Sequence, residues 1–405
     1  MSDASHLMQE GIAFESGMRP APCYRLVLLN VAAGTSVSAA ANALEAVTRM
    51  LRELASGRVR ELEGQPSRQT EASEEHFSGL RSLLGYGRRF FDCDVHEPAL
   101  TELKRSDFLS YLPGPPAAFP SIPWAREDDS NPGEADIAIQ LTGDRESAVS
   151  CAAVEIWKLV VDERLPLEVV SSFAGFGRLD GRGWLEFHDG VSNLDSSQRL
   201  ETLEALADPA WMEGGTYMAF LRLAVDLALW RSLERSAQEL IVGRDKLSGI
   251  ALRSVDREGG RACPVVAPAG GGDPSAVELA EWRDPPQTTD PLLEASHVHR
   301  SNQNRASSGA PGGLRIFRQG YDYLNGLGPG GPALGLNFVS FQSDLRALHH
   351  ALYLPGWLGD ANFGGPVDPH EGDPPSPPLL ALVAGGLYAV PPTAEPFPGA
   401  GLLGR

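Results

Sequence analysis

The sequence predicts an α+β protein with two similar halves, each of which holds β-strands with helices on one face of the sheet. Apolar strand-like runs alternate with amphipathic helical stretches in both halves, and long segments rich in proline and glycine separate them. The halves share this order of elements without apparent sequence identity, so the duplication is one of pattern.

Two strand–helix units make up the first half. The run YRLVLLNV at 24–31 is expected to be a buried strand, and residues 36–56 follow as a helix with an apolar stripe. The run ADIAIQL at 135–141 begins the second unit, whose helix carries apolar residues from Val149 to Val160. A third strand is expected at 167–176.

The second half repeats this order. A strand at 216–225, TYMAFLRLAV, precedes a helix expected at 226–243. A strand at 336–342 then leads to a helix with apolar residues on one face between 345 and 352. The run GGLYAVPP at 385–392 is expected to be the closing strand.

Segments rich in proline and glycine are expected to be loops. They cover 112–134, 256–275, 300–313, 324–335 and 364–378. Residues 1–20 and 394–405 are expected to be flexible tails.

The composition excludes two classes of partner. The chain of 405 residues has 53 acidic and 34 basic side chains, and no cluster of Lys or Arg offsets the formal charge of −19. Such a chain repels the phosphates of nucleic acids. No apolar run reaches the length of a membrane span, no secretory signal is visible, and the four cysteines form no CxxC pair. We therefore expect a cytoplasmic protein with no nucleic-acid or membrane partner.

Two polar interruptions of apolar segments are candidates for a site. In GWLEFHDGVSNL, 183–194, Asp189 and Gly190 indicate first of all a tight turn, and a functional loop is the alternative. In RIFRQGYDY, 315–323, Arg318 lies in an apolar–aromatic stretch, where a cation needs an anion, a cofactor or solvent. A surface strand residue is the alternative there.

A histidine pair stands in ASHVHRSNQNR, 295–305. On a strand, His297 and His299 would share a face and could bind one ion together, whereas on a helix they would lie about 200° apart. No Glu stands where a strand-borne site would need one, and no Cys is near for zinc. The apolar start of the segment favours His297 pointing inward from a short helix or turn. A single imidazole ligand fits haem better than zinc, and a hydrogen-bonded core histidine is the alternative.

Several of these segments together carry a family resemblance. FHDGVSN, QELIVGRDKLSG, SHVHRSN, RIFRQGYDY and GLNFVSFQSDLRALHHAL occur in the order found in dye-decolourising peroxidases. LLGYGRRFFD, ADIAIQLTGDRESAV and LVAGGLYAVPP also resemble that family, so the similarity runs from about residue 24 to residue 393.

The resemblance implies a haem peroxidase of two ferredoxin-like α+β domains, with antiparallel sheets and helices on one face. We place these domains at 21–195 and 196–393, with haem b mainly in the second. The implied enzyme reduces hydrogen peroxide and oxidises dyes, phenols or other small aromatic donors through a ferryl intermediate.

The resemblance also assigns roles to individual residues. His297 resembles the proximal iron ligand, since the family pattern begins His-Ile-Arg and then has Asn. Asp189 resembles the distal acid–base residue, which would carry a proton between the two peroxide oxygens. Arg318 matches the distal arginine that stabilises developing negative charge. Three further positions are implied to line the haem: Gly190, Val191 and Asn302.

Three departures from the family pattern stand out. Glu186 replaces the first glycine of Gly-x-x-Asp-Gly, and NQNR replaces Asn-Pro-Arg, so that Arg305 stands one residue late. Gly320 stands where some relatives carry a distal asparagine. These departures leave room for a haem-binding or haem-handling protein with little peroxidase turnover.

A third hypothesis is a non-haem enzyme in which His188, Asp189 and the pair at 297 and 299 bind a metal. For donors too bulky to reach the haem, electron transfer through an aromatic side chain is expected. Trp184, Tyr321 and Tyr323 are candidates by proximity in sequence.

Overall fold

Eight strands of the computed structural model form one closed barrel in the order β1-β3-β2-β10-β5-β9-β8-β4. The structure describes residues 8–13, 20–62, 67–92, 118–119, 133–194, 196–205, 210–265, 287–301 and 315–404.

The first half of the chain supplies one half of the barrel. Its main elements are β1 (Cys23–Val31), α1 (Val37–Ala55), β2 (Arg81–Gly87), β3 (Ile137–Gly143), α4 (Glu146–Asp162) and β4 (Leu167–Phe176). Two shorter helices, α2 (Ser67–Phe77) and α3 (Arg88–Asp92), flank β2. The strands lie side by side as β4-β1-β3-β2.

The second half has the same plan. It contains β5 (Thr216–Val225), α6 (Leu227–Ser232), α7 (Arg235–Val242), β8 (Phe317–Gly328), β9 (Gly331–Gln342), α11 (Arg346–Tyr353) and β10 (Leu380–Val390). Shorter elements are α5 (Ser196–Leu203), β6 (Ser254–Asp256), β7 (Cys263–Val265), α9 (Pro291–Glu294) and α10 (His297–Arg300). The strand order β10-β5-β9-β8 repeats that of the first half. Each half is therefore a ferredoxin-like α+β unit, and the predicted fold class is confirmed.

The two sheets join edge to edge through antiparallel pairs. β2 pairs with β10, where Tyr388 lies opposite Gly87. β4 pairs with β8, where Phe176 lies opposite Asp322. These short pairings close the barrel, although each joins the two sheets over only one or two residue pairs.

Both faces of β1 and β5 are largely buried, which explains why their sequences are mostly apolar. Tyr24, Leu26 and Leu28 of β1 belong to the cluster inside the barrel, while Val27 and Leu29 pack outward in the cluster with α1 and α4. β5 alternates in the same way between the barrel interior and an outer cluster that includes residues of α6, α7 and α11. A strand buried on two faces reads as a continuous apolar run.

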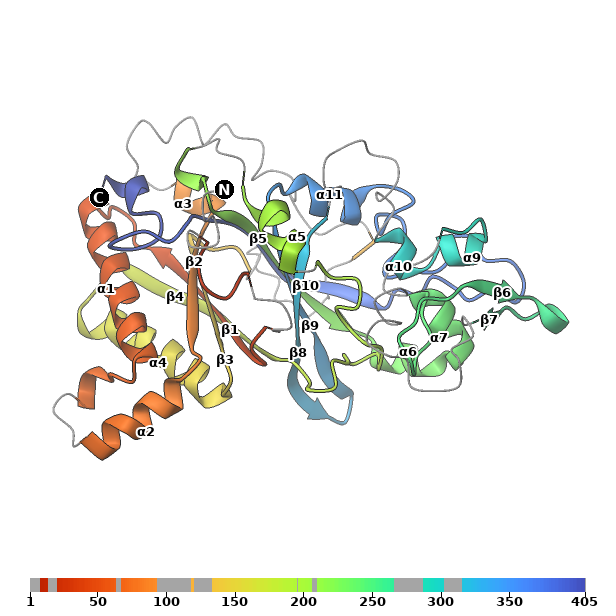
Figure 1. Ribbon diagram of the computed structural model, residues 1–405, viewed down its shortest axis with the longest axis horizontal. Coiled ribbons are helices and arrows are strands. Elements are labelled where there is room, and N and C mark those ends of the chain that lie inside the picture. The colour runs from red at the N-terminus through yellow and green to blue at the C-terminus, as the bar shows by residue number, and fades with distance from the viewer. Residues whose placement is uncertain are drawn as a thin grey trace.

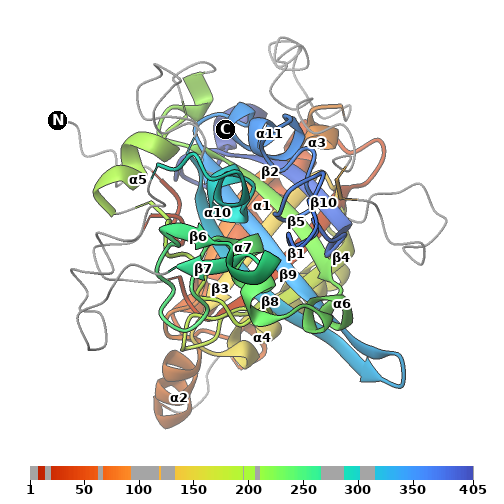
Figure 2. The same cartoon turned by 90° about the vertical axis from the view of Figure 1, so that its right-hand side faces the viewer.

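Two groups of helices lie at opposite ends of the molecule. Figure 1 shows α1, α2 and α4 at one end and α6, α7, α9 and α10 at the other, with the barrel strands between them. The view of Figure 2 looks at the second end, where α7 and α10 lie in front of the barrel.

Two expected elements were wrong. The helix expected at 226–243 is broken into α6 and α7, because Leu233 and Glu234 adopt extended backbone angles between them. The loop expected at 324–335 is mostly strand, because β8 and β9 continue to within two residues of each other as a hairpin. This hairpin projects from the lower side of the molecule in Figure 1.

The expected flexible tails were also wrong over the parts that the structure describes. The side chain of Gln9 donates to the backbone oxygens of Leu84 and Pro391, each at 2.8 Å. At the other end Phe397, Leu402 and Leu403 are buried in the core cluster of α1. Apolar side chains spaced along a segment rich in proline and glycine are sufficient to fix it to a core.

No helix among the described residues is long and apolar enough to cross a membrane.

The domain boundary expected between 195 and 196 lies between β4 and α5 and stays a prediction.

Candidate functional site

The segment between β4 and residue 194, which we call the distal loop (177–194), folds back on itself. The backbone N–H of Asp189 donates to the oxygen of Gly181 at 2.8 Å, and Arg182 pairs with His188 in an antiparallel bridge. Glu186 adopts a positive φ of 63°, the left-handed conformation that glycine adopts without strain. The expected glycine conformation is therefore present although the residue is Glu. Its carboxylate pairs with Arg178 at 3.0 Å.

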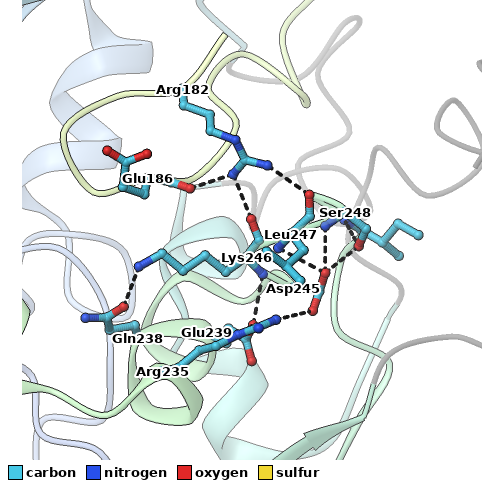
Figure 3. Close-up of polar contacts among 10 residues, drawn as sticks. Arg182, Glu186, Arg235, Gln238, Glu239, Asp245, Lys246, Leu247 and Ser248 are labelled. Atoms are coloured by element: carbon cyan, nitrogen blue, oxygen red, sulfur yellow. Dashed lines mark hydrogen bonds and ion pairs between the residues drawn. The ribbon is translucent and has the colours of Figure 1, made fainter. Parts of the chain in front are cut away.

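Arg182 ties the distal loop to the segment that follows α7 (Figure 3). Its guanidinium donates to the backbone oxygens of Glu186, Lys246 and Leu247 at 2.6, 2.7 and 2.9 Å. It also lies 2.9 Å from Nε2 of His188. Because one planar group joins both segments, the loop has a fixed position relative to α7.

The segment after α7 has its own polar framework, also drawn in Figure 3. The Asp245 carboxylate accepts hydrogen bonds from the N–H and the hydroxyl of Ser248, both at 2.7 Å. Burial alone would raise the pKa of Asp245, but these hydrogen bonds and the charge of Arg235 keep it below its ordinary value. A side-chain oxygen of Glu239 accepts from the N–H of Lys246 at 3.0 Å. The turn is thus a rigid support for Arg182.

Asp189 lies directly over strand β8. A Cβ atom placed on Gly320 would be 2.7 Å from Oδ2 of Asp189, which is closer than real Cβ contacts. The absence of a side chain at Gly320 therefore lets the carboxylate approach the strand. Asn193 fixes the same contact, because its side chain donates to the oxygen of Arg318 at 2.7 Å and accepts from the N–H of Arg318 at 3.0 Å.

His297 is the first residue of α10. Nδ1 of its ring lies 2.9 Å from the backbone oxygen of Phe363, and its imidazole stacks on the phenyl ring with centroids 4.2 Å apart. A Cβ at Gly364 would lie 2.6 Å from the N atom of His297, so only glycine permits this close packing. With Nδ1 protonated and donating, Nε2 keeps its lone pair for a ligand.

The charges of Arg318 and Asp189 act on the imidazole of His297. The pKa of His297 is lowered to about 4; burial is the largest cause, and the positive charges of Arg318 and Arg244 act in the same direction. The carbonyl of Phe363 and the negative charge of Asp189 act in the opposite direction. The imidazole is therefore neutral at physiological pH, as a metal ligand must be.

The structure thus places Asp189 against β8 close to Arg318, and the charges of both residues act on His297 of α10. Gly190 and Val191 follow Asp189 in the distal loop, whereas Asn302 and Arg305 lie outside the described residues. His299 is two residues along a helical turn, so the hypothesis of a shared ligand pair was wrong. No three His, Cys, Asp or Glu side chains within the described ranges are arranged to hold a metal ion, which does not support the non-haem hypothesis.

The aromatic candidates for electron transfer occupy different environments. Tyr321 is buried inside the barrel and stacks on Tyr24, with ring centroids 4.4 Å apart. The ring of Tyr323 lies 3.5 Å from the guanidinium carbon of Arg222. Trp184 is partly buried and donates to the oxygen of Gly335 at 3.1 Å.

Sequence reasoning missed several residues of this site. Gly364 begins the segment 364–378, which the sequence predicted to be a loop with no role in the site. Phe363 directly precedes this segment. Arg244 lies in a quoted motif without an assigned role, yet its guanidinium donates to Ser192 of the distal loop and to the oxygen of Gly249. An arginine inside an apolar segment, as at Arg318, was the pattern that could have indicated it.

Asp322 was also missed. It is buried, and it belongs to the same strand face as Arg318 and Gly320. Burial raises its pKa to about 7, and the negative charge of Asp189 contributes.

Comparison with known proteins decides which family this arrangement belongs to. The model of the family described as "Dyp-type peroxidase, C-terminal" matches residues 180–395, which include the distal loop, His297 and Arg318. The chain belongs to the Dyp-type peroxidase family. The matched segment begins within the distal loop and ends beyond β10.

Individual relatives are distant. A dye-decolorizing peroxidase from Thermobifida fusca is 29% identical over 248 residues, which is 56% of this chain and 51% of the relative. A deferrochelatase from Escherichia coli is 28% identical over 170 residues, 40% of this chain and 34% of the relative. The chain spans about half or less of the length of these curated relatives. Ferric DtpA from Streptomyces lividans has the same fold, with a TM-score of 0.65, 23% identity and full coverage of both chains.

Proposed function

We propose that this chain is a haem peroxidase that reduces hydrogen peroxide and oxidises small aromatic donors. The observation that carries the proposal is that the half-buried imidazole of His297 donates through Nδ1 to the carbonyl of Phe363, while Asp189 lies against Gly320 of β8, two residues from Arg318. The charges of Asp189 and Arg318 both act on His297. A ligand on one side with an acid–base residue and a fixed cation on the other is the arrangement that peroxide cleavage requires.

Haem b is the cofactor that these residues fit. The porphyrin supplies the equatorial donors of its iron, so one protein imidazole is sufficient, and His297 presents one free nitrogen. Leu185, Ile316, Phe338 and Phe363 are partly buried apolar residues that pack against one cluster, and Phe363 of this set stacks on His297. They suit the faces of a large flat macrocycle. The neighbour from Streptomyces lividans is described as ferric, so it contains iron.

On the proximal side, the chain holds the imidazole of His297 in one orientation, and no carboxylate accepts its Nδ1 hydrogen to increase its basicity. The acceptor for Nδ1 is the neutral backbone oxygen of Phe363, so His297 would bind as a neutral imidazole. Gly243 and Gly364 allow α7 and the segment after α11 to pack closely on α10, which holds the ring in one orientation.

On the distal side, Asp189 accepts a proton from hydrogen peroxide and returns it to the departing oxygen. General acid–base catalysis of this kind contributes about 10²- to 10⁴-fold in rate. Arg318, whose guanidinium keeps its positive charge, stabilises the negative charge that develops as the O–O bond breaks. Bound haem would supply the redox-active iron that passes electrons from the donor to peroxide.

The test is a haemin titration followed by absorption, with peroxide and a phenolic donor added to the loaded protein. We expect one haem per chain, turnover of the donor, and loss of haem binding in His297→Ala but not in the matched control His299→Ala. Asp189→Asn should keep haem and lose roughly 10²-fold or more in turnover. Unchanged turnover in Asp189→Asn would contradict its assigned role.

Haem handling with little peroxidase turnover is the second candidate, because several relatives are named deferrochelatases. In that case the wild-type protein would bind haem through His297 but would oxidise no donor when peroxide is added. The same titration therefore separates the two functions.

A further inference from the structure

Strand β8 presents three consecutive outward positions to the distal loop. Arg318, Gly320 and Asp322 share one face because side chains alternate along a strand, and positions two apart are separated by about 7 Å. Asp189 occupies the middle position, since its Oδ2 lies where a side chain on Gly320 would be. Its carboxylate thus lies between a fixed cation and a second carboxyl group.

The carboxyl group of Asp322 is enclosed by the distal loop and by the seam between the two half-barrels. Its residue is opposite Phe176 of β4 and Leu336 of β9. The backbone N–H of Trp184 donates to the carboxyl group. A Cβ on Gly183 would lie 3.6 Å from Oδ1, so the group packs directly on the loop backbone.

The charged groups that act on Asp322 come from both elements around it. The pKa of Asp322 is raised to about 7, and burial is the largest cause. The negative charges of Asp189 and Glu186 act in the same direction, while Arg178 and the N–H of Trp184 act in the opposite direction. Arg178 is itself paired with Asp180 and Glu186, so it does not form an ion pair with Asp322.

We propose that Asp322 is an auxiliary acid that stores a proton behind Asp189 and exchanges it with Asp189 through water during turnover. The inference rests on the proposed function. In the exchange, the carboxyl group of Asp322 loses a proton, the carboxylate of Asp189 gains it, and the total charge stays the same. Reduction of one peroxide to two waters takes two electrons from the aromatic donor and two protons from solvent. Asp322 acts through Asp189 and does not contact peroxide.

The first experiment uses the protein without haem, so it does not depend on catalysis. Infrared difference spectroscopy follows the C=O band of a protonated carboxyl group as the pH is raised. We expect a band that disappears with a midpoint at about 7 and that is absent in Asp322→Asn. In Asp189→Asn the midpoint should move to lower pH, because the neighbouring negative charge is removed. An unchanged band in Asp322→Asn, or an unchanged midpoint in Asp189→Asn, overturns the proposal.

The second experiment measures the pH profile of donor oxidation by the haem-loaded protein. The wild type should lose turnover as the pH rises through about 7, and Asp322→Asn should not show this decrease. Below about pH 7, turnover by Asp322→Asn should be roughly tenfold lower than that of the wild type, which is less than the full effect of losing an acid–base residue. Asp322→Glu keeps a titrating carboxyl group, so its turnover should again decrease as the pH rises. Asp162→Asn, a change of an exposed aspartate at the end of α4, is the matched control.

The two experiments separate the possible failures. A normal infrared titration in a protein that never turns over peroxide would contradict the proposed function and leave the coupling of the two carboxyl groups supported. If turnover by Asp322→Asn decreases with rising pH as it does in the wild type, the role of Asp322 is overturned and the proposed function is not affected. If Asp322→Asn does not fold, the shift of the midpoint in Asp189→Asn decides.

Discussion

The backbone oxygen of Phe363 lies 2.9 Å from Nδ1 of His297, and the phenyl ring of the same residue stacks on the imidazole at 4.2 Å between centroids. One residue therefore fixes both the tautomer and the rotation of the proposed iron ligand. The partner is a neutral carbonyl, which makes His297 a neutral ligand.

Removing this stack should loosen the ligand. In Phe363→Ala the carbonyl stays but the ring is lost, so we expect weaker haem binding and a cost of about 2 kcal/mol in the free energy of unfolding. Phe363→Leu, which keeps most of the volume, separates loss of packing from loss of stacking. Haem affinity and the iron–histidine vibration in resonance Raman spectra are the measurements. Identical values in all three proteins would contradict this role for the ring.

A methyl group at position 320 should displace Asp189. Gly320→Ala places a Cβ 2.7 Å from Oδ2, so the carboxylate must move away from β8. We expect haem binding to persist while peroxide turnover falls by about 10- to 100-fold, a loss in the range of a misplaced acid–base group. Gly326→Ala on the same strand meets no atom within 4 Å and serves as the control. Equal turnover in the two variants would show that the close approach is unimportant.

Substitutions at Glu186 should show whether the distal loop needs a left-handed backbone conformation at this position. Its φ of 63° costs a residue with a side chain about 1–2 kcal/mol. Glu186→Gly and Glu186→Val both remove the ion pair with Arg178, so the difference between them isolates the backbone. By urea unfolding, the valine variant should be less stable than the glycine variant by at least about 1 kcal/mol. Equal stabilities would mean that the loop does not need the left-handed conformation.

The buried acid predicts how stability depends on pH. Burial raises the pKa of Asp322 from 3.8 to about 7, so the folded state binds this proton more tightly than the unfolded state. Its contribution is complete below about pH 4 and is lost as the pH rises through about 7. Unfolding of the protein without haem should show this loss, while Asp322→Asn should be less dependent on pH in the same range. A loss of the same size in the variant would assign it to other groups.

Much of the fold followed from local patterns. The strand limits at 167–176 and 216–225 agree with β4 and β5, because both runs are rich in apolar residues and are followed by the turn-forming residues Gly177 and Asp226. The hairpin of β8 and β9 was missed, since its glycines and proline are typical of a loop and only pairing between the strands stabilises it there. The closing residues were missed for a related reason, because packing on α1 fixes them rather than any periodicity.

The sequence by itself determined which residue types are available for the chemistry: an Asp-Gly turn, an arginine in an apolar strand and a histidine at the start of a short polar segment. Their order along the chain carried the family resemblance. Tertiary structure alone decided that Asp189 lies over Gly320, that Phe363 holds His297, and that Asp322 is a buried acid beside Asp189. These relationships join residues far apart in the chain, and they arise because closure of the barrel and packing of α10 bring distant segments into contact.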